Sequence, residues 1–117
     1  MNRSVESLTD IGKMREENQD AIAWKKVGDR TWFLVVSDGM GGYAGGSLAS
    51  QTVVDSIIEQ LEDISEEALM EHPQLHMRKL INAANQMVNK KAIEQPSFKD
   101  MGATCVCALV ANTRVYS

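Results

Sequence analysis

The chain has 117 residues, of which 44% are hydrophobic, and a formal net charge of -4 at pH 7. This length is enough for one globular domain with its own core, while the acidic balance argues against general affinity for nucleic acid, which depends on clustered Lys and Arg. No apolar run is long enough to cross a membrane and no secretory signal opens the chain, so we expect a cytoplasmic protein that binds neither membranes nor nucleic acid.

The first third of the chain predicts strands. Residues 4–8 alternate weakly and predict a strand, after which residues 9–12 predict a turn and residues 13–20 a polar, charged connector. Residues 21–26 and 31–36 flank the hairpin signal Gly28-Asp29. We therefore expect these two segments to pair as antiparallel strands.

The next segment follows a helical period. Apolar residues recur on one helix face from Gly46 onward, with Ser47 as the expected N-cap, and Ser65 starts a short helix that Pro73 closes. A third helix follows. Its buried stripe is predicted to consist of Met77, Leu80, Ile81, Ala84, Met87 and Val88.

The C-terminal part returns to strands. Residues 103–111 are nearly all apolar and rich in β-branched side chains, which predicts a strand that is covered on both faces. Asn112-Thr113 predicts a tight turn, and Arg114 begins another strand. Without an internal repeat or a low-complexity linker, these elements form one domain of the α/β or α+β class.

Cys105 and Cys107 lie two residues apart, so on a strand their side chains share one face. A disulfide between them is sterically poor. The pair could also begin a soft-metal site, but no further Cys and no well-placed His accompanies it. We interpret both residues as core residues with free thiols, which are typical of the cytoplasm.

The segment VVSDGMGGYAGGSLAS, residues 35–50, leads a hydrophobic strand into an aspartate and then into glycines. One interpretation is a dinucleotide fingerprint, but the acidic residue that should end a second strand falls inside a helix. The other interpretation is that Asp38 holds a hard cation from a strand end, beside a glycine whose carbonyl is accessible. A nucleophilic aspartate of the dehalogenase type would need a second acid where Met40 stands.

Three segments in order, TDIGKMREENQD, VVSDGMGGYAGGSLAS and MGATCVCALV, resemble the N-terminal motifs of the metal-dependent serine/threonine protein phosphatases, the type 2C family in its bacterial form. The resemblance spans nearly the whole chain from Thr9, but only about the first half of such a domain. It implies that residues 1–117 are the N-terminal part of a single phosphatase catalytic domain. The implied fold is α+β, part of a four-layer α-β-β-α sandwich with mainly antiparallel sheets.

The resemblance also implies an activity, cofactors and site residues. The family hydrolyses phosphoserine and phosphothreonine on signalling proteins, opposing a kinase, through a water activated by two Mg²⁺ or Mn²⁺ ions. Matched onto this sequence, Asp38 bridges the metals, Gly39 offers its carbonyl to one ion, and Asp20 supports the metal cluster through water. Arg15 binds the substrate phosphate through its guanidinium group and, with Asp38, is a catalytic residue.

Without the motif, Arg15 would more readily be interpreted as a surface partner of Glu16 or Glu17, and Asp20 as a turn cap. The sequence also departs from the family pattern. Gln19 stands where many members carry Glu, and Met40 stands where some carry a histidine, so we assign no general acid. Ala103 replaces a common Thr, which leaves Gly102 and Thr104 as structural residues.

The family's remaining metal aspartates lie beyond the last residue of this sequence, so we expect little or no turnover from this chain alone. Sheet edges left unpaired would favour an edge-strand homodimer or a partner that completes the sheets. The alternative function is a non-catalytic regulatory or interaction module that retains a phosphatase-like half-fold.

Overall fold

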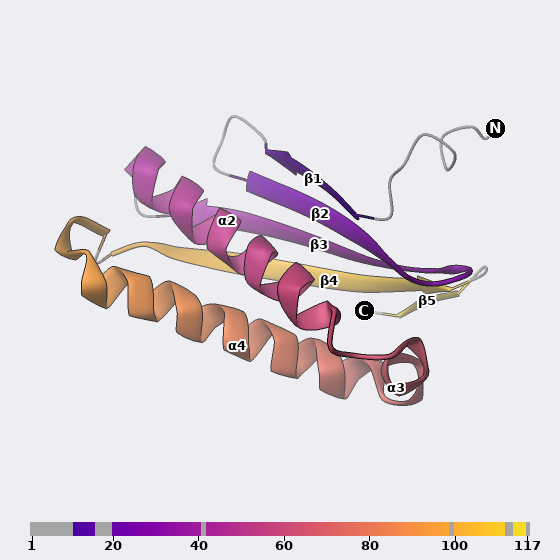
Figure 1. Cartoon of the computed structure of the whole chain (residues 1–117). Coiled ribbons are helices and arrows are strands. Elements are labelled where there is room, and N and C mark those ends of the chain that lie inside the picture. The colour runs from indigo at the N-terminus through magenta and orange to yellow at the C-terminus, as the bar shows by residue number, and fades with distance from the viewer. Residues whose placement is uncertain (1–10, 16–19, 41, 99, 112–113, 117) are drawn as a thin grey trace.

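The computed structural model describes residues 11–15, 20–40, 42–98, 100–111 and 114–116. The strand predicted at residues 4–8 and the turn predicted at residues 112–113 lie outside these ranges. In chain order, the elements are β1 (Ile11–Arg15), β2 (Asp20–Gly28), β3 (Thr31–Met40), α2 (Gly42–Leu61), α3 (Glu66–Glu71), α4 (Pro73–Glu94), the 3-10 turn η1 (Pro96–Phe98), β4 (Gly102–Ala111) and β5 (Arg114–Tyr116). They form a sheet with α2 and α4 on one face (Figure 1).

The sheet has five strands in the order β1-β2-β3-β4-β5, and every neighbouring pair is antiparallel. The predicted β2–β3 hairpin is confirmed, and its turn lies at Asp29 and Arg30, one residue later than the Gly28-Asp29 signal. β4 follows three helices in the chain, yet it pairs with β3 along its whole length, from Thr31 with Ala111 to Met40 with Gly102. The ends of β1 and β3 therefore lie beside the starts of β2 and β4, on the left in Figure 1.

The core lies between the sheet and the helices. Phe33, Val35 and Ser37 alternate along β3 and are fully buried against the helical layer. Burial of a side chain the size of Phe or Val stabilises the fold by about 1.5–3 kcal/mol. The helices contribute the buried residues Ala49, Val53, Val54, Ile57, Ile58, Leu61, Met77, Leu80, Ala84 and Val88.

The N-terminal prediction is wrong at residues 11–15, which form β1 instead of a turn and a polar connector. β1 is the first strand of the sheet, and its Lys13 side chain reaches over to α2, where Nζ lies 2.5 Å from Asp55 Oδ1. Polar residues are compatible with a strand here because an edge strand has one solvated side. Both partners are half exposed, so this ion pair contributes less than about 1 kcal/mol.

Two helix predictions also need correction. α2 begins at Gly42, so Ser47 lies inside the helix and is not its N-cap. Met87 is not part of the buried stripe of α4, because 42% of its surface is exposed. By contrast, the short helix is confirmed: Ser65 is the N-cap of α3, and its Oγ accepts a hydrogen bond of 3.1 Å from Ala68 N.

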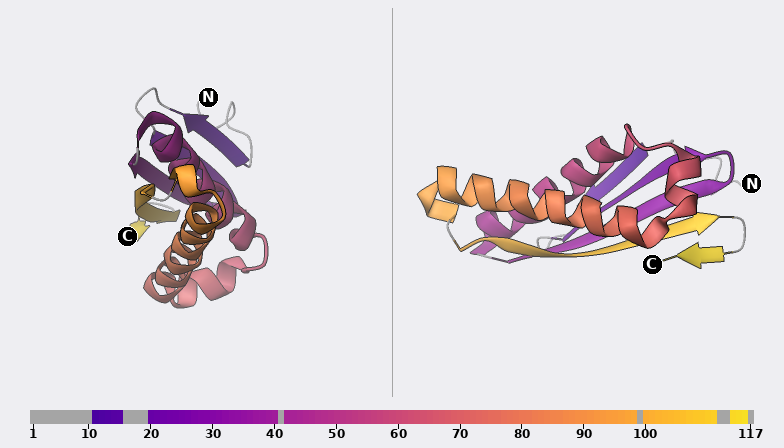
Figure 2. Two further views of the ribbon diagram at one scale, coloured as in Figure 1. Left: turned by 90° about the vertical axis from the view of Figure 1, so that its left-hand side faces the viewer. Right: turned by 90° about the horizontal axis from the view of Figure 1, so that it is seen from below.

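β4 is covered on one face, whereas the sequence predicted cover on both. Cys107 and Leu109 are buried against the helices. On the opposite face, Val106 is 65% exposed and its cross-strand neighbour Val36 is 43% exposed. Figure 2 shows both long helices on the same side of the sheet, and no described element covers the other side. We call this other side the open face.

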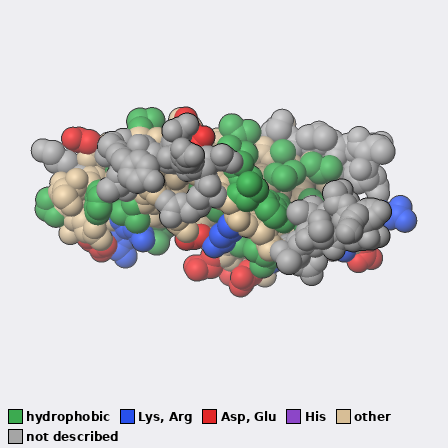
Figure 3. Space-filling model, turned by 90° about the horizontal axis from the view of Figure 1, so that it is seen from above, with side chains coloured by type: hydrophobic (Ala, Val, Ile, Leu, Met, Phe, Trp, Pro, Cys, Tyr) green, Lys and Arg blue, Asp and Glu red, His purple; other side chains and the backbone are tan. Residues whose placement is uncertain are grey.

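The apolar residues of β4 therefore contribute to the core on one face and to an exposed hydrophobic surface on the open face. Hydrophobic side chains also lie at the surface that is seen from above, on the side of β1 (Figure 3). The α+β class with an antiparallel sheet is confirmed, and the described residues supply one sheet layer and one helical layer of the expected sandwich. No described helix has the length and apolar character needed to span a membrane.

Candidate functional site

Two carboxylates meet at the end of the sheet where β2 begins and β3 ends. Asp20, the first residue of β2, pairs directly with Asp38 of β3. Directly opposed residues project from the same face of a sheet, with Cβ atoms roughly 4.5–5.5 Å apart. Asp38 shares the open face with Val36, two residues earlier in the strand. The structure thus brings together the two aspartates that the sequence analysis selected.

This pair has an electrostatic consequence. Like charges directly opposite each other destabilise a sheet, and a divalent cation between them would offset the repulsion. Carboxylate oxygens are the ligands that Mg²⁺ and similar hard cations prefer. Asp38 is exposed and Asp20 is partly buried, so the pair is open to solvent on one side. This donor set fits a hard cation.

The donor set is partial. Within the described ranges, no group of three or more His, Cys, Asp or Glu side chains is placed to share a metal ion. Two carboxylates, one backbone carbonyl and water make an incomplete coordination sphere for Mg²⁺, which usually keeps several waters. The pair is therefore consistent with part of a metal centre.

Gly39 follows Asp38 and has a structural requirement of its own. A Cβ atom at residue 39 would overlap the backbone carbonyl oxygen of Gly46 in α2. The helix can approach the end of β3 this closely because neither residue has a side chain in the way. This contact explains part of the glycine-rich sequence without any ligand.

Two hydrogen bonds fix the end of β3 to β4. The buried Ser37 donates from Oγ to Thr104 O at 2.8 Å, and Thr104 donates from Oγ1 to the backbone carbonyl of Asp38 at 3.4 Å. Thr104 was predicted to be structural, and these contacts agree with that prediction. The sequence analysis missed Ser37, although a single hydroxyl inside an apolar strand was a signal. These contacts hold the backbone that carries the Asp38 carboxylate in place against β4.

Arg15 ends β1 and pairs with Ala21, the residue after Asp20. The backbone of Arg15 therefore lies one register step from the carboxylate pair. The side chain of Arg15, which was predicted to bind the substrate phosphate, lies outside the described part of the structure.

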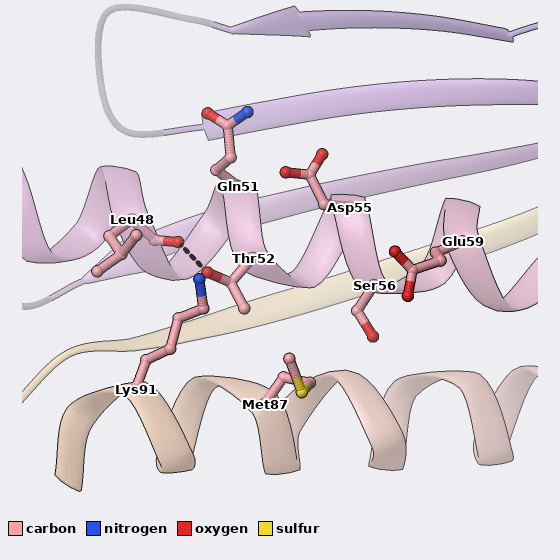
Figure 4. A pocket seen from close by; sticks show the side chains of 8 residues that line it. All are labelled: Leu48, Gln51, Thr52, Asp55, Ser56, Glu59, Met87 and Lys91. Carbon is pink, nitrogen blue, oxygen red and sulfur yellow. Dashed lines mark hydrogen bonds between the residues drawn. The ribbon is translucent and has the colours of Figure 1, made fainter. Parts of the chain in front are cut away.

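A separate pocket of about 320 Å³ opens between α2 and α4 (Figure 4). It belongs to the helical layer, whereas Asp20 and Asp38 belong to the open face of the sheet. None of the candidate site residues Arg15, Asp20, Asp38 and Gly39 lines this pocket. Its lining consists of Leu48, Gln51, Thr52, Asp55, Ser56, Glu59, Met87 and Lys91.

Comparison with known sequences decides the family. The sequence model described as protein phosphatase 2C matches residues 13–117, which include Arg15, both aspartates and β4. The chain belongs to the protein phosphatase 2C family. The family predicted from the three motifs is therefore confirmed.

Bacterial members of the protein phosphatase 2C family are similar over nearly the whole chain. The serine/threonine phosphatase stp of Listeria welshimeri is 28% identical over 111 residues, which are 95% of this chain and 44% of that protein. The serine/threonine protein phosphatase PstP of Mycobacterium tuberculosis is 28% identical over 107 residues, which are 92% of this chain and 19% of that protein. The chain thus spans less than half the length of these relatives.

Two solved phosphatase structures have the same arrangement of elements. A bacterial serine phosphatase bearing an R161E mutation has a TM-score of 0.69 at 28% identity, and the match covers 93% of this chain and 52% of the other. The M. tuberculosis phosphatase PstP has a TM-score of 0.64 at 24% identity, over 90% of this chain and 43% of the other. The second likeness supports the fold alone.

Proposed function

We propose that this chain supplies part of the catalytic domain of a protein serine/threonine phosphatase, which hydrolyses phosphoserine and phosphothreonine through a metal-activated water. The direct pairing of Asp20 with Asp38 carries the proposal. It places two acidic side chains on one face at a strand end, inside the region that matches protein phosphatase 2C. In this proposal, residues 1–117 are the N-terminal part of a single catalytic domain.

The metal centre would be held by Asp38 as the bridging ligand, by the backbone carbonyl of Gly39, and by Asp20 through water. Two Mg²⁺ or Mn²⁺ ions in the complete site would lower the pKa of a bound water and neutralise charge on the transferring phosphoryl group. The rigid end of β3 orients the Asp38 carboxylate, since Thr104 and Ser37 tie that end to β4. Arg15 would bind the substrate phosphate, because a planar guanidinium can contact two phosphate oxygens.

The substrates would be phosphoproteins that a serine/threonine kinase modifies in the cytoplasm. The names of the relatives support this class of substrate, since they are serine/threonine phosphatases. The net charge of -4 supports the absence of nucleic-acid binding in this proposal.

The test has two measurements on the purified chain. The first is binding of a phosphothreonine peptide, compared with its unphosphorylated form, with and without Mn²⁺. The second is phosphate release. We expect Mn²⁺-dependent binding of the phosphorylated peptide and little or no turnover, because the described residues supply two acidic ligands. Asp38→Asn should remove the Mn²⁺ dependence. Equal binding of both peptides at all Mn²⁺ concentrations would contradict the proposed site, and Mn²⁺-dependent turnover would contradict the partial nature of the domain.

A second candidate function is a non-catalytic regulatory or interaction module. The observation that favours it is the open face, where Val36 and Val106 remain exposed. A partner that packs on the open face would cover this surface, and a second copy paired edge to edge would satisfy the free strand edges. Light scattering on the purified chain separates the candidates: a stable dimer that binds no Mn²⁺ would support the module, and a monomer that binds Mn²⁺ through Asp38 would exclude it.

A further inference from the structure

The open face carries two apolar rows that run across the sheet. Strand register defines them: the first row is Ile22, Val36 and Val106, and the second row is Trp24, Leu34 and Ala108. All six residues are at least partly exposed to solvent. A contiguous exposed apolar surface with polar residues at its rim is typical of a contact surface.

Charged residues lie beyond each row, and they differ in sign. Asp20 and Asp38 lie beside the first row. The exposed Lys26 lies beside the second row, where it pairs with Trp32. The open face therefore has an acidic pair at one end, a lysine at the other end, and apolar residues between them.

We propose that the open face is the contact surface of a homodimer, in which two copies pack face to face around a two-fold axis that runs across the strands between the two rows. Such an axis lies at the level of Ala23, Val35 and Cys107, which are paired with one another across the sheet. It places the first row of each copy on the second row of the other, as an isologous interface requires. It also places Asp20 opposite the second copy's Lys26.

The usual geometry of packed sheets is compatible with this arrangement. Aligned sheets lie about 10 Å apart, and their strands cross at about 30°. Three residues from the axis, this angle displaces facing residues by roughly 5 Å, which the long side chain of Lys26 can span. An axis parallel to the strands would instead bring the Asp20–Asp38 pairs of the two copies together, and opposed like charges disfavour that contact.

The area of the open face is sufficient for a dimer. Strands β1 to β4 contain 5, 9, 10 and 10 residues. At about 3.4 Å per residue and about 4.8 Å between strands, the face measures roughly 550 Å². Two copies would bury roughly 1,100 Å², slightly more than the roughly 1,000 Å² that a specific interface needs.

The edges of the sheet favour contact through the face over edge-to-edge pairing. The edge strand β1 has 5 residues, which include Lys13 and Arg15. On the other edge, β5 has 3 residues, which include Arg114. Short edge strands with basic residues disfavour pairing with another chain.

The test is sedimentation equilibrium of the purified chain in EDTA, combined with tryptophan fluorescence. EDTA removes any divalent cation that would compete with Lys26 for Asp20, so the result does not depend on the proposed metal centre. Both tryptophans of the chain, Trp24 and Trp32, lie on the open face. We expect a monomer–dimer equilibrium, and a shift of the tryptophan emission to shorter wavelength as the dimer forms.

Charge variants test the orientation of the two copies. Lys26→Asp should weaken the dimer at least about 10-fold, because each dimer contains two opposed Asp20–Lys26 pairs. Adding Asp20→Lys to this variant should restore the dissociation constant to within about 3-fold of the original value, because the pairs form again with reversed charges. Lys90→Asp makes the same charge change at an exposed position on α4, so it is the matched control and should have no effect.

Val106→Asp is a second variant, which places a charge in the first row. Val106 is 65% exposed, so this change should abolish the dimer and leave the circular dichroism spectrum of the monomer unchanged.

Four results would overturn the proposal. A chain that stays monomeric at all concentrations would show that the open face has a different occupant. A dimer whose tryptophan emission does not change would indicate edge-to-edge pairing. Equal dissociation constants in Lys26→Asp and Lys90→Asp, or a folded double variant that associates as weakly as Lys26→Asp, would contradict the two-fold arrangement.

Discussion

Gly39 at the end of β3 and Gly46 in the second turn of α2 pack backbone against backbone. The carbonyl oxygen of Gly46 occupies the space that a side chain at residue 39 would need. The contact holds the N-terminal part of α2 against the strand end that carries Asp38. The glycine next to the candidate metal ligand therefore has a packing role, whether or not its own carbonyl binds a cation.

Gly39→Ala is expected to destabilise the fold by about 1–3 kcal/mol, the usual effect of overpacking a close contact. The obstacle is helix backbone, which cannot move aside as the end of a flexible side chain can. Urea unfolding followed by circular dichroism measures the change in the free energy of unfolding.

Gly102→Ala is the matched control for this prediction. Gly102 pairs with Met40, one register step from Gly39, and a Cβ there would lie 3.6 Å from Met40 Cγ, an ordinary contact. We expect a change within about 0.5 kcal/mol. Equal effects at the two glycines would show that the close approach of α2 is not the cause.

Thr31 and Glu66 join the β2–β3 hairpin to α3. Thr31 is buried and donates from Oγ1 to Glu66 Oε2 at 2.6 Å. Thr31→Val keeps the shape and removes the donor, so we expect a loss of about 1.5–3 kcal/mol, as for a hydrogen bond to a charged group. Glu67→Gln, an exposed neighbour on α3, should stay within about 0.5 kcal/mol in the same urea experiment.

The two thiols should titrate in order, Cys105 before Cys107. The hydrogen bond from Cys107 lowers the pKa of Cys105, although partial burial opposes this effect. The pKa of Cys107 is raised, first by its hydrogen bond to Cys105 and then by burial and the nearby thiolate charge. Because alkylation needs the thiolate, iodoacetamide should modify Cys105 at a lower pH than Cys107.

Cys107→Ala removes the main cause of the lowered pKa. The thiolate fraction of Cys105 at neutral pH should therefore fall, and its alkylation rate, measured by mass spectrometry, should fall with it. The direction of the pKa shift of Cys105 also determines how the stability of the fold depends on pH. A lowered folded pKa at Cys105 contributes stability above the pKa of the unfolded thiol, and this contribution is lost as the pH falls through the folded value. An alkylation rate that rises in the variant would contradict the assignment.

The open face should drive association of the purified chain. Val106 is 65% exposed, so Val106→Thr reduces the apolar surface and keeps a β-branched residue in the strand. We expect a lower apparent mass by light scattering at high protein concentration and a change in unfolding free energy within about 0.5 kcal/mol.

Val35→Thr provides the contrast on the buried face. Val35 is fully buried on β3, so a hydroxyl there should destabilise the fold by about 1–3 kcal/mol. A Val106→Thr variant that associates as strongly as the original chain would show that the open face is not the contact surface.

Several elements followed from the sequence because local signals determined them. Gly28-Asp29 predicted the β2–β3 hairpin, and Ser65 predicted the start of α3 through its cap. The two aspartates came from motif resemblance, and strand register brought them together. Neither the hairpin nor the cap requires information from distant parts of the chain.

The sequence-based predictions were wrong where tertiary contacts override the local conformational preference of the residues. Glycine disfavours helix by about 1 kcal/mol per residue, yet α2 begins in the glycine-rich segment because β3 packs against it. β1 carries two basic residues, Lys13 and Arg15, and forms because β2 offers it a partner. An apolar strand with one open face, as in β4, has the same composition as a strand covered on both faces, so the sequence could not separate them.

The most direct test of the metal centre is Mn²⁺ binding to the purified chain, measured by electron paramagnetic resonance as the loss of the free-ion signal. The account predicts binding by the original chain, a large loss in Asp38→Asn, and retention in Asp55→Asn, whose carboxylate lies on α2 beside Lys13. Binding that is unchanged by Asp38→Asn, or lost equally in both variants, would contradict the claim that Asp20 and Asp38 hold the cation.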